Sequence, residues 1–172
     1  MRIVAGEFGG RRLVAPTGTG TRPTSDRVRE ALFSILGPID GDAVLDLFAG
    51  TGALGLEALS RGAKYVDFVE NGPPSLHALK ANVAALRVTK KARIFKKDAL
   101  PFVAQLDVDR YDIAFVDPPY ESRMLDRVID SWKARRFSRI LMVEHATSHV
   151  LPPPDDRRIF RESAVSVYRL AP

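Results

Sequence analysis

The chain lacks cysteine altogether, which excludes disulfide bonds, cysteine nucleophiles and metal sites built from thiolates. It also lacks an apolar stretch long enough to span a bilayer, and its first residues have no apolar core of the kind found in signal peptides. The three histidines, His77, His145 and His149, do not have the spacing of metal ligands. We therefore expect a cytoplasmic protein that contains no metal and binds no membrane.

A length of 172 residues predicts a single domain with a sizeable core. The hydrophobic and charged fractions of 45% and 27% are ordinary for a soluble globular protein. Lysine and arginine number 26 against 21 aspartate and glutamate residues, which gives a net charge of +5. This excess of positive charge favours a polyanionic partner without identifying it.

Strand-like and helix-like segments alternate through most of the chain. The predicted strands are 43–48, 65–70, 92–97, 111–117 and 140–143, and the predicted helices are 53–60, 74–86, a short one after Pro101, and 125–134. Such alternation predicts an α/β fold with a mostly parallel central sheet and helices on both faces. Two strand-like runs at 157–161 and 164–170 have no helix between them and predict a closing antiparallel hairpin.

A small basic arm and a helix within residues 1–38 precede the core of residues 43–172. The glycine-rich arm is compatible with either a hairpin or a solvated tail. Residues 24–36 then predict an amphipathic helix with a polar cap at its start and a Gly-Pro stop at its end. We expect Arg27 and Arg29 to project from the faces of this helix that do not pack on the core.

A buried strand, a glycine turn and a helix follow one another over residues 44–55. Gly50, Gly52 and Gly55 allow the backbone to approach a ligand and match the spacing of dinucleotide-binding loops. Glu70 ends the next strand, where a carboxylate would accept hydrogen bonds from ribose hydroxyls. The loop alone therefore admits two cofactors, a nicotinamide or flavin dinucleotide and S-adenosylmethionine.

Two further acids favour S-adenosylmethionine. Asp46 stands on the strand just before the glycines, where it would repel a diphosphate but suit the ammonium group of a methionine moiety. Asp98 follows the third predicted strand, where it could accept a hydrogen bond from an adenine amino group. No acid or base suited to hydride transfer is apparent downstream of these residues.

The sequence Asp117-Pro118-Pro119-Tyr120 follows an apolar strand that is expected to be buried on both faces. The prolines stiffen the turn and remove two N–H donors, so the turn offers a carboxylate and bare carbonyl oxygens as acceptors beside an aromatic ring. Such a turn suits a substrate that donates hydrogen bonds through an amino group. Alternatively, the prolines merely end the strand and Tyr120 packs on the rim of the sheet.

Together these motifs resemble a known family. The loop FAGTG with Asp46, Glu70, Asp98 and the DPPY turn are similar to class I methyltransferases that act on an exocyclic amino nitrogen. GGRRL at 9–13 and TRPTSDRVREALFSIL at 21–36 resemble the RsmD family, which methylates a guanine N2 of bacterial 16S ribosomal RNA. The resemblance covers nearly the whole chain and implies a Rossmann-like fold, S-adenosylmethionine as cofactor, and a monomer that acts on ribosomal RNA within a 30S particle or assembly intermediate.

The roles of individual residues follow from this resemblance and from the chemistry of the amine. Asp117, expected to be ionised at neutral pH, and the Pro118 carbonyl would accept the two amino hydrogens, while Tyr120 would stack on the extruded base. The predicted cofactor site consists of Thr24, Asp46, Phe48, Gly50, Thr51, Gly52, Glu70, Asp98 and Ala99. The predicted RNA-binding residues are Arg11, Arg12, Arg22, Arg27 and Pro119.

Other functions remain open at the level of sequence. A DNA adenine N6 methyltransferase would use the same proline turn, although it would normally need more chain to recognise DNA. A dinucleotide-dependent oxidoreductase fits the glycine spacing, and a non-catalytic RNA-binding protein could keep the same fold. The basic run at residues 87–97 is either a second phosphate-binding patch or only solvated surface.

Overall fold

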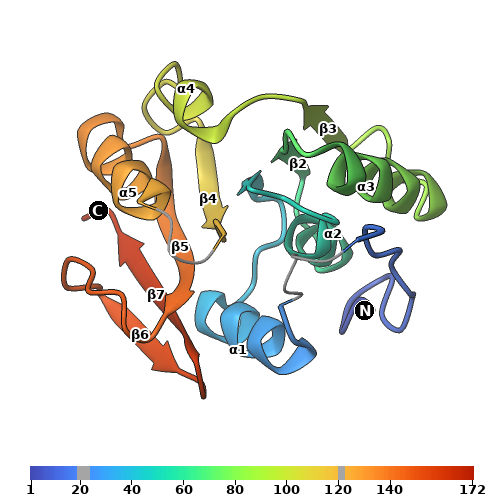
Figure 1. The fold of residues 1–172 in the computed structure, drawn as a ribbon, viewed down its shortest axis with the longest axis horizontal. Helices are drawn as coiled ribbons and strands as arrows, with labels where there is room; N and C mark the ends of the chain where they lie inside the picture. Colours follow the sequence, from blue (N-terminus) through green and yellow to red (C-terminus); the bar gives the residue numbers. More distant parts are fainter. Residues whose placement is uncertain (19–23, 120–122) are drawn as a thin grey trace.

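The structure is a computed structural model that describes residues 1–18, 24–119 and 123–172 (Figure 1). Its strands are β1 Ala43–Leu47, β2 Tyr65–Val69, β3 Ala92–Phe95, β4 Tyr111–Val116, β5 Ser138–Ala146, β6 Asp156–Ile159 and β7 Ser163–Arg169. Its helices are α1 Asp26–Leu36, α2 Ala53–Ser60, α3 Pro73–Ala85, α4 Ala99–Val103 and α5 Met124–Arg135. Two residues of the predicted site, Arg22 and Tyr120, lie outside the described residues.

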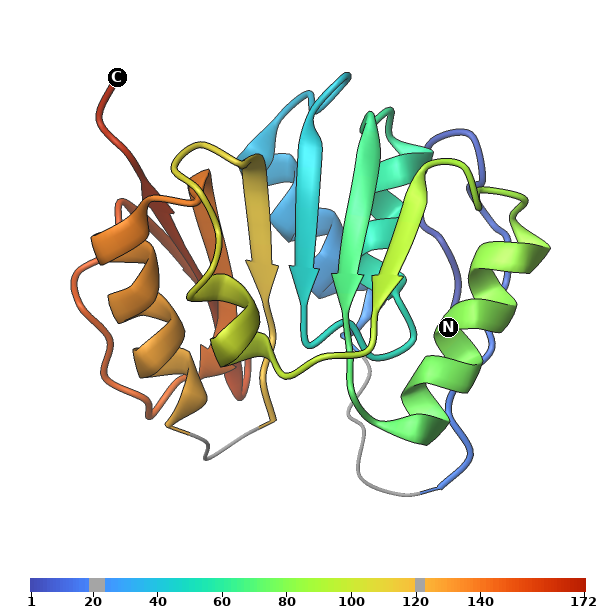
Figure 2. The same ribbon diagram turned by 90° about the horizontal axis from the view of Figure 1, so that it is seen from above.

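The strands form one sheet in the order β3-β2-β1-β4-β5-β7-β6. The first five strands in that order are parallel, as Figure 2 shows, whereas β7 runs antiparallel to both β5 and β6. The prediction of an α/β fold with a mostly parallel sheet and a closing hairpin is confirmed. The strand order reverses between β1 and β4, and open α/β sheets bind ligands beyond the carboxyl ends of the strands at such a reversal.

Helices cover both faces of the sheet, because neighbouring residues of the buried strands point to opposite sides. One hydrophobic cluster joins the strands to the arm, α1, α2 and α3, and includes Val44 and Phe115. The other joins them to α4 and α5 and includes Leu45 and Val116. Figure 2 shows α1 and α2 on the opposite side of the strands from α4 and α5.

The arm is a hairpin that is bound to the core, so the alternative of a solvated tail is wrong. Its two sides meet at an antiparallel bridge between Arg2 and Arg12, and its Ile3 side chain is buried in the first cluster. Glu57 of α2 is also buried and accepts hydrogen bonds from the backbone of the arm, including the Val4 N–H at 2.8 Å. These contacts fix the arm against α2.

The prediction for Arg29 was wrong, because its side chain is completely buried. Its guanidinium donates to Asp26 Oδ1 at 2.7 Å and to the Thr24 carbonyl at 2.9 Å, and it lies 3.7 Å from Glu57. A buried cation is tolerated where opposite charges and carbonyl oxygens surround it in this way. Arg29 therefore connects the start of α1 to α2, whereas Arg27 is exposed as expected.

Several predicted boundaries also change; for example, the strand predicted at 92–97 ends at Phe95. Helix α4 begins at Ala99, before Pro101 rather than after it, which is possible because a proline in the first turn removes an N–H that has no partner inside the helix. Strand β5 extends to Ala146 because residues 144–146 pair with β7, beyond the point where its pairing with β4 ends at Val143. No helix among the described residues is long and apolar enough to cross a membrane.

Candidate functional site

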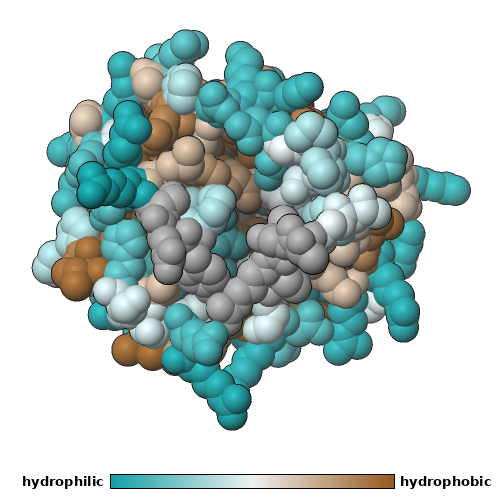
Figure 3. All heavy atoms as spheres, viewed as in Figure 1, coloured by the Kyte–Doolittle hydropathy of each residue, from teal (hydrophilic) through white to brown (hydrophobic). Residues whose placement is uncertain are grey.

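A cavity of about 1440 Å³ opens at the carboxyl ends of the parallel strands. Figure 3 shows this face of the molecule, with a hollow near its centre. The cavity is larger than the roughly 300 to 1,000 Å³ typical of small-molecule sites. Eleven of the predicted site residues line it: Thr24, Asp46, Phe48, Gly50, Thr51, Glu70, Asp98, Ala99, Asp117, Pro118 and Pro119.

The glycine loop leads from β1 into α2 and forms one wall of this cavity. Gly50 has a φ of 58°, and a Cβ atom placed on it would meet no atom within 4 Å, so its backbone faces open space. Gly55 sits instead against the sheet, because a Cβ there would lie 2.3 Å from the Phe68 ring. Gly52 caps α2 and does not line the cavity. The loop thus combines ligand access at Gly50 with close helix packing at Gly55.

Asp46 is buried at the end of β1, beside the glycine loop. Its Oδ2 accepts a hydrogen bond from the Gly55 N–H at 3.0 Å. Burial, and secondarily the charge of Glu70, raises the pKa of Asp46 to about 8 despite this hydrogen bond. No described cation lies within ion-pair distance of it, so this carboxylate would gain from a cationic ligand.

Glu70 and Asp98 stand at the ends of the next two strands, β2 and β3. Glu70 accepts hydrogen bonds from the Gly50 N–H and the Gly72 N–H, both at 2.8 Å, and from the Asn71 N–H at 2.9 Å. Asn71 donates its side-chain amide to Asp98 and thereby joins the two strand ends. A carboxylate has about four acceptor positions, so both acids keep capacity for hydroxyl or amino groups of a ligand.

The proline turn begins where β4 ends, next to β1 in the sheet. Asp117 is partly buried, and its Oδ2 lies 3.3 Å from the Thr24 hydroxyl. Pro118 is partly buried and Pro119 is exposed. Because neither proline carries an N–H, the described part of the turn offers only acceptors toward the cavity.

Glu144 is a neighbour of this turn that the sequence reasoning missed. It lies on β5, and its Oε2 is 2.9 Å from the Thr24 hydroxyl that also contacts Asp117. Burial first and Glu144 second raise the pKa of Asp117 well above its ordinary value, which works against the ionised state expected at neutral pH. Glu144 directly follows the predicted strand 140–143, so its place at a strand end was the signal that could have found it.

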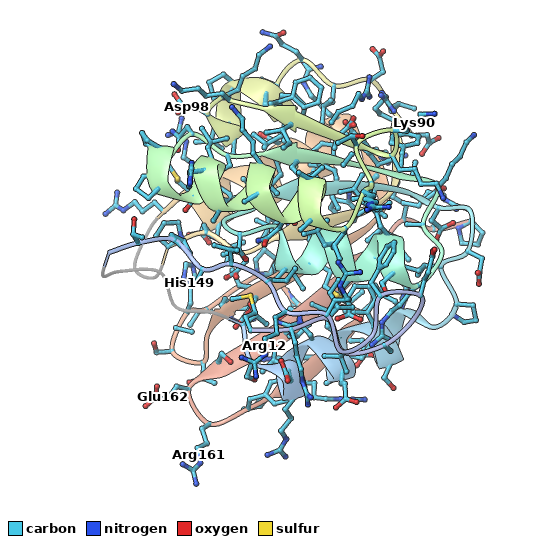
Figure 4. The ribbon with its side chains drawn as sticks, turned by 90° about the vertical axis from the view of Figure 1, so that its right-hand side faces the viewer. Arg12, Lys90, Asp98, His149, Arg161 and Glu162 are labelled. Atoms are coloured by element: carbon cyan, nitrogen blue, oxygen red, sulfur yellow. The ribbon has the colours of Figure 1, made fainter. Side chains whose placement is uncertain are left out.

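The predicted RNA-binding arginines do not line the cavity. Arg11 is exposed, and its guanidinium donates to the Ala85 carbonyl at 3.0 Å. Arg12, labelled in Figure 4, and Arg27 are exposed as well. In the described part of the chain, no group of three or more His, Asp or Glu side chains could hold a metal ion.

Comparison with known proteins gives consistent matches along the chain. A family model described as "Conserved hypothetical protein 95" matches residues 1–167. The Ribosomal RNA small subunit methyltransferase D of Escherichia coli (strain K12) is 38% identical, with 99% of this chain and 88% of that protein covered. The Putative rRNA methyltransferase YlbH of Bacillus subtilis is also 38% identical, with 88% of this chain and 86% of that protein covered.

Solved structures agree with these matches. A putative methyltransferase from Escherichia coli superposes with a TM-score of 0.85 at 35% identity, and covers 98% of this chain and 97% of its own. A putative methylase from Haemophilus influenzae superposes with a TM-score of 0.81 at 30% identity, with the same coverage of 98% and 97%.

Proposed function

The chain belongs to the RsmD family, whose family model carries the description Conserved hypothetical protein 95, and on that premise we propose its reaction. The protein transfers a methyl group from S-adenosylmethionine to the exocyclic N2 amino group of a guanine in small-subunit ribosomal RNA. Its curated relatives are named as methyltransferases of ribosomal RNA. The guanine N2 assignment follows the RsmD family.

The observation that carries this proposal is the shared cavity of the glycine loop and the proline turn. Asp46 and Asp117 end neighbouring strands, since Leu47 is paired with Val116 in the register of β1 and β4. A cofactor on the glycine loop and an amine at the proline turn would therefore meet in the same cavity. Holding two reactants in this way contributes much of the acceleration of a transfer reaction.

The residues of the cavity fit S-adenosylmethionine. Its ammonium and sulfonium groups are cations. Burial raises the pKa of the Asp46 carboxyl, and a nearby cation would stabilise its ionised form. Glu70 would hold the ribose hydroxyls, and Asp98 with Ala99 would hold the adenine. The open space beside Gly50 leaves room for the ligand against the loop backbone. When bound, S-adenosylmethionine supplies an electrophilic methyl group on a positively charged sulfur.

The proline turn would prepare the amine for attack. An aromatic exocyclic nitrogen shares its lone pair with the ring and is a poor nucleophile, so its orientation matters. Asp117 and the Pro118 carbonyl would each accept one amino hydrogen, which leaves the nitrogen lone pair free to point at the methyl group. In its ionised form, Asp117 would then take the proton that the methylated nitrogen loses. Its raised pKa makes that carboxylate a stronger base than an ordinary aspartate.

The target guanine would have to leave its stacked position to reach this cavity. Tyr120, the residue after Pro119, remains the predicted stacking partner for the extruded base. Such a contact is worth about 1 to 3 kcal/mol. Thr24 would close the same space from the start of α1, because its hydroxyl reaches both Asp117 and Glu144.

Methyl transfer from labelled S-adenosylmethionine tests the proposal. The acceptors are 30S particles from cells that lack the equivalent activity, free 16S ribosomal RNA and double-stranded DNA. We expect label in N2-methylguanosine at one nucleotide, with loss of label in Asp117→Ala and retention in Asp107→Ala. Asp107 is a matched control because it is exposed and does not line the cavity.

Two outcomes would contradict the proposal. Label in N6-methyladenine of DNA would show a DNA adenine methyltransferase that uses the same turn. Binding of NADH in place of S-adenosylmethionine, measured by calorimetry, would favour the oxidoreductase that the glycine spacing also permits.

A further inference from the structure

The charged side chains that line the cavity are mostly acids, and a nucleic acid that approaches them is itself negatively charged. Five carboxyl groups line it, from Asp46, Glu70, Asp98, Asp117 and Asp130. A cationic cofactor suits these acids, but RNA phosphates would be repelled by them. Among the side chains of the described lining residues, only those of Lys97 and Arg127 carry positive charge.

Lys97 lies just beyond the carboxyl end of β3, immediately before Asp98. Its side chain is exposed and forms no ion pair with any residue that the structure describes. The position places a free ammonium group at the same edge of the sheet as the predicted adenine site.

Arg127 belongs to α5, the helix that follows the proline turn. It too is exposed, and within residues 1–18, 24–119 and 123–172 it makes no ion pair. Arg127 and Lys97 therefore reach the cavity from two different elements, α5 and the segment after β3.

The remaining cations of the basic run 87–97 are placed differently. Lys90 comes before β3 and Lys97 comes after it, so the two lie at opposite ends of a strand whose four residues span about 13 Å at roughly 3.3 Å per residue. Figure 4 shows Lys90 and Asp98 far apart on the molecule. Arg93, within β3, donates to Asp67 at 2.8 and 2.7 Å and is already paired. The run is thus divided by β3, and its Lys97 end alone lines the cavity.

We propose that Lys97 and Arg127 bind the backbone phosphates of the nucleotides next to the target guanine, an inference that rests on the proposed function. When a base is extruded into a pocket, its flanking phosphates stay at the mouth of that pocket. Two unpaired cations on the wall can fix the single strand there and offset the repulsion from the acids. The guanidinium of Arg127 would accommodate two phosphate oxygens, while Lys97 would act as a point charge.

The test measures methylation kinetics and RNA binding for Lys97→Gln, Arg127→Gln and the double variant. We expect each single change to raise the KM for RNA about 3- to 10-fold. The slope of log affinity against log salt concentration should fall by about 0.7 for each removed phosphate contact to a single strand. The Kd for S-adenosylmethionine should stay at the wild-type value, since neither cation serves the cofactor.

Lys90→Gln and Lys133→Gln are the matched controls. Lys90 comes from the same basic run and Lys133 from the same helix as Arg127, and neither lines the cavity. Lys97→Arg and Arg127→Lys keep the charge and should largely restore the salt slope. Thermal denaturation of each variant checks that the fold is retained.

The inference is overturned if the Gln variants have the KM and salt slope of the two controls while the wild type methylates its RNA. It is also overturned if they lose cofactor affinity with an unchanged salt slope. Absence of methylation in the wild type itself would instead contradict the proposed function, so the two failures are distinguishable.

Discussion

Asp67 and Asp46 are two equally buried carboxylates, 0% and 2% exposed, on neighbouring strands of one sheet. Asp67 accepts hydrogen bonds from Arg93 and from the Tyr111 hydroxyl, the latter at 2.6 Å. Asp46 has only a backbone N–H within the described residues and no cation. The same side chain thus has its partners within the protein at one place and no cationic partner among the described residues at the other. A buried carboxyl group without a cationic partner is the clearer indication of a candidate site.

The largest expected effect is that of Asp117→Asn on methyl transfer. Asparagine keeps the shape of the turn but cannot take up the proton, so the single-turnover rate should fall about 10²- to 10⁴-fold. The free energy of unfolding should not fall, because the change relieves the repulsion between Asp117 and Glu144. Chemical denaturation of the same sample measures the free energy of unfolding. A variant that is both inactive and destabilised would show that Asp117 stabilises the fold, as Asp67 does, and would contradict the distinction between acids that serve the site and acids that stabilise the fold.

Asp46→Asn should lower the affinity for S-adenosylmethionine about 10- to 100-fold at pH 8. The carboxylate must ionise to hold an ammonium group, so wild-type affinity should rise as the pH increases toward the pKa of about 8 and level off above it. In the variant this rise should disappear. Isothermal titration calorimetry between pH 6 and pH 9 measures both curves, and a wild-type curve that is flat with pH would rule out Asp46 as the ammonium partner.

The raised pKa of Asp46 also predicts how the stability of the ligand-free protein depends on pH. Asp46 has its ordinary pKa near 3.8 in the unfolded chain and a pKa of about 8 in the folded protein. Between these values the folded protein holds the additional proton, so this carboxyl destabilises the fold progressively as the pH rises. Asp46→Asn should therefore raise the unfolding temperature more at pH 8 than at pH 5. An equal change at both values would show that Asp46 does not titrate in this range.

In contrast to Asp117→Asn and Asp46→Asn, the change Asp67→Asn should lower the stability of the fold and leave methyl transfer unchanged. It removes the carboxylate that Arg93 and Tyr111 share, which should lower the free energy of unfolding by about 2 kcal/mol. This loss is modest because the Arg93 side chain is 57% exposed and remains hydrated. Urea denaturation measures the loss, and turnover per folded molecule should equal that of the wild type.

Most of the parallel sheet could be predicted from the sequence, because its strands are short apolar runs with acids and glycines at their ends. The cavity-lining acids Asp46, Glu70 and Asp98 can be predicted in this way, since parallel strands bring their carboxyl ends to one edge. Glu144 directly follows the predicted strand 140–143, so the same rule could have pointed to it, although β5 in fact continues past it to pair with β7. Its contact with Thr24 depends on a helix that is more than 100 residues away in sequence.

The burial of Arg29 could not be predicted either. A helical pattern places an arginine on a polar face, and only the tertiary structure supplies the acids and carbonyl oxygens that make burial tolerable. Likewise, the run 87–97 was one patch in the sequence, but the four-residue strand β3 separates its two ends. The sequence shows which charged residues are present, but only the tertiary structure shows which of them have a partner of opposite charge.

The smallest expected effect concerns the arm, where two neighbouring cations, Arg11 and Arg12, can be compared as Asp46 and Asp67 were. Both arginines are exposed. The Arg11 guanidinium donates to the Ala85 carbonyl at the end of α3. The Arg12 side chain forms no hydrogen bond within the described residues. Arg12→Gln should therefore raise the KM for RNA about 2- to 3-fold and lower the salt slope by about 0.7, with no change in unfolding temperature. Arg11→Gln should also lower the unfolding temperature slightly, because it removes a contact between the arm and α3. If Arg12→Gln leaves the salt slope unchanged while Lys97→Gln lowers it, RNA contacts the wall of the cavity and not the arm.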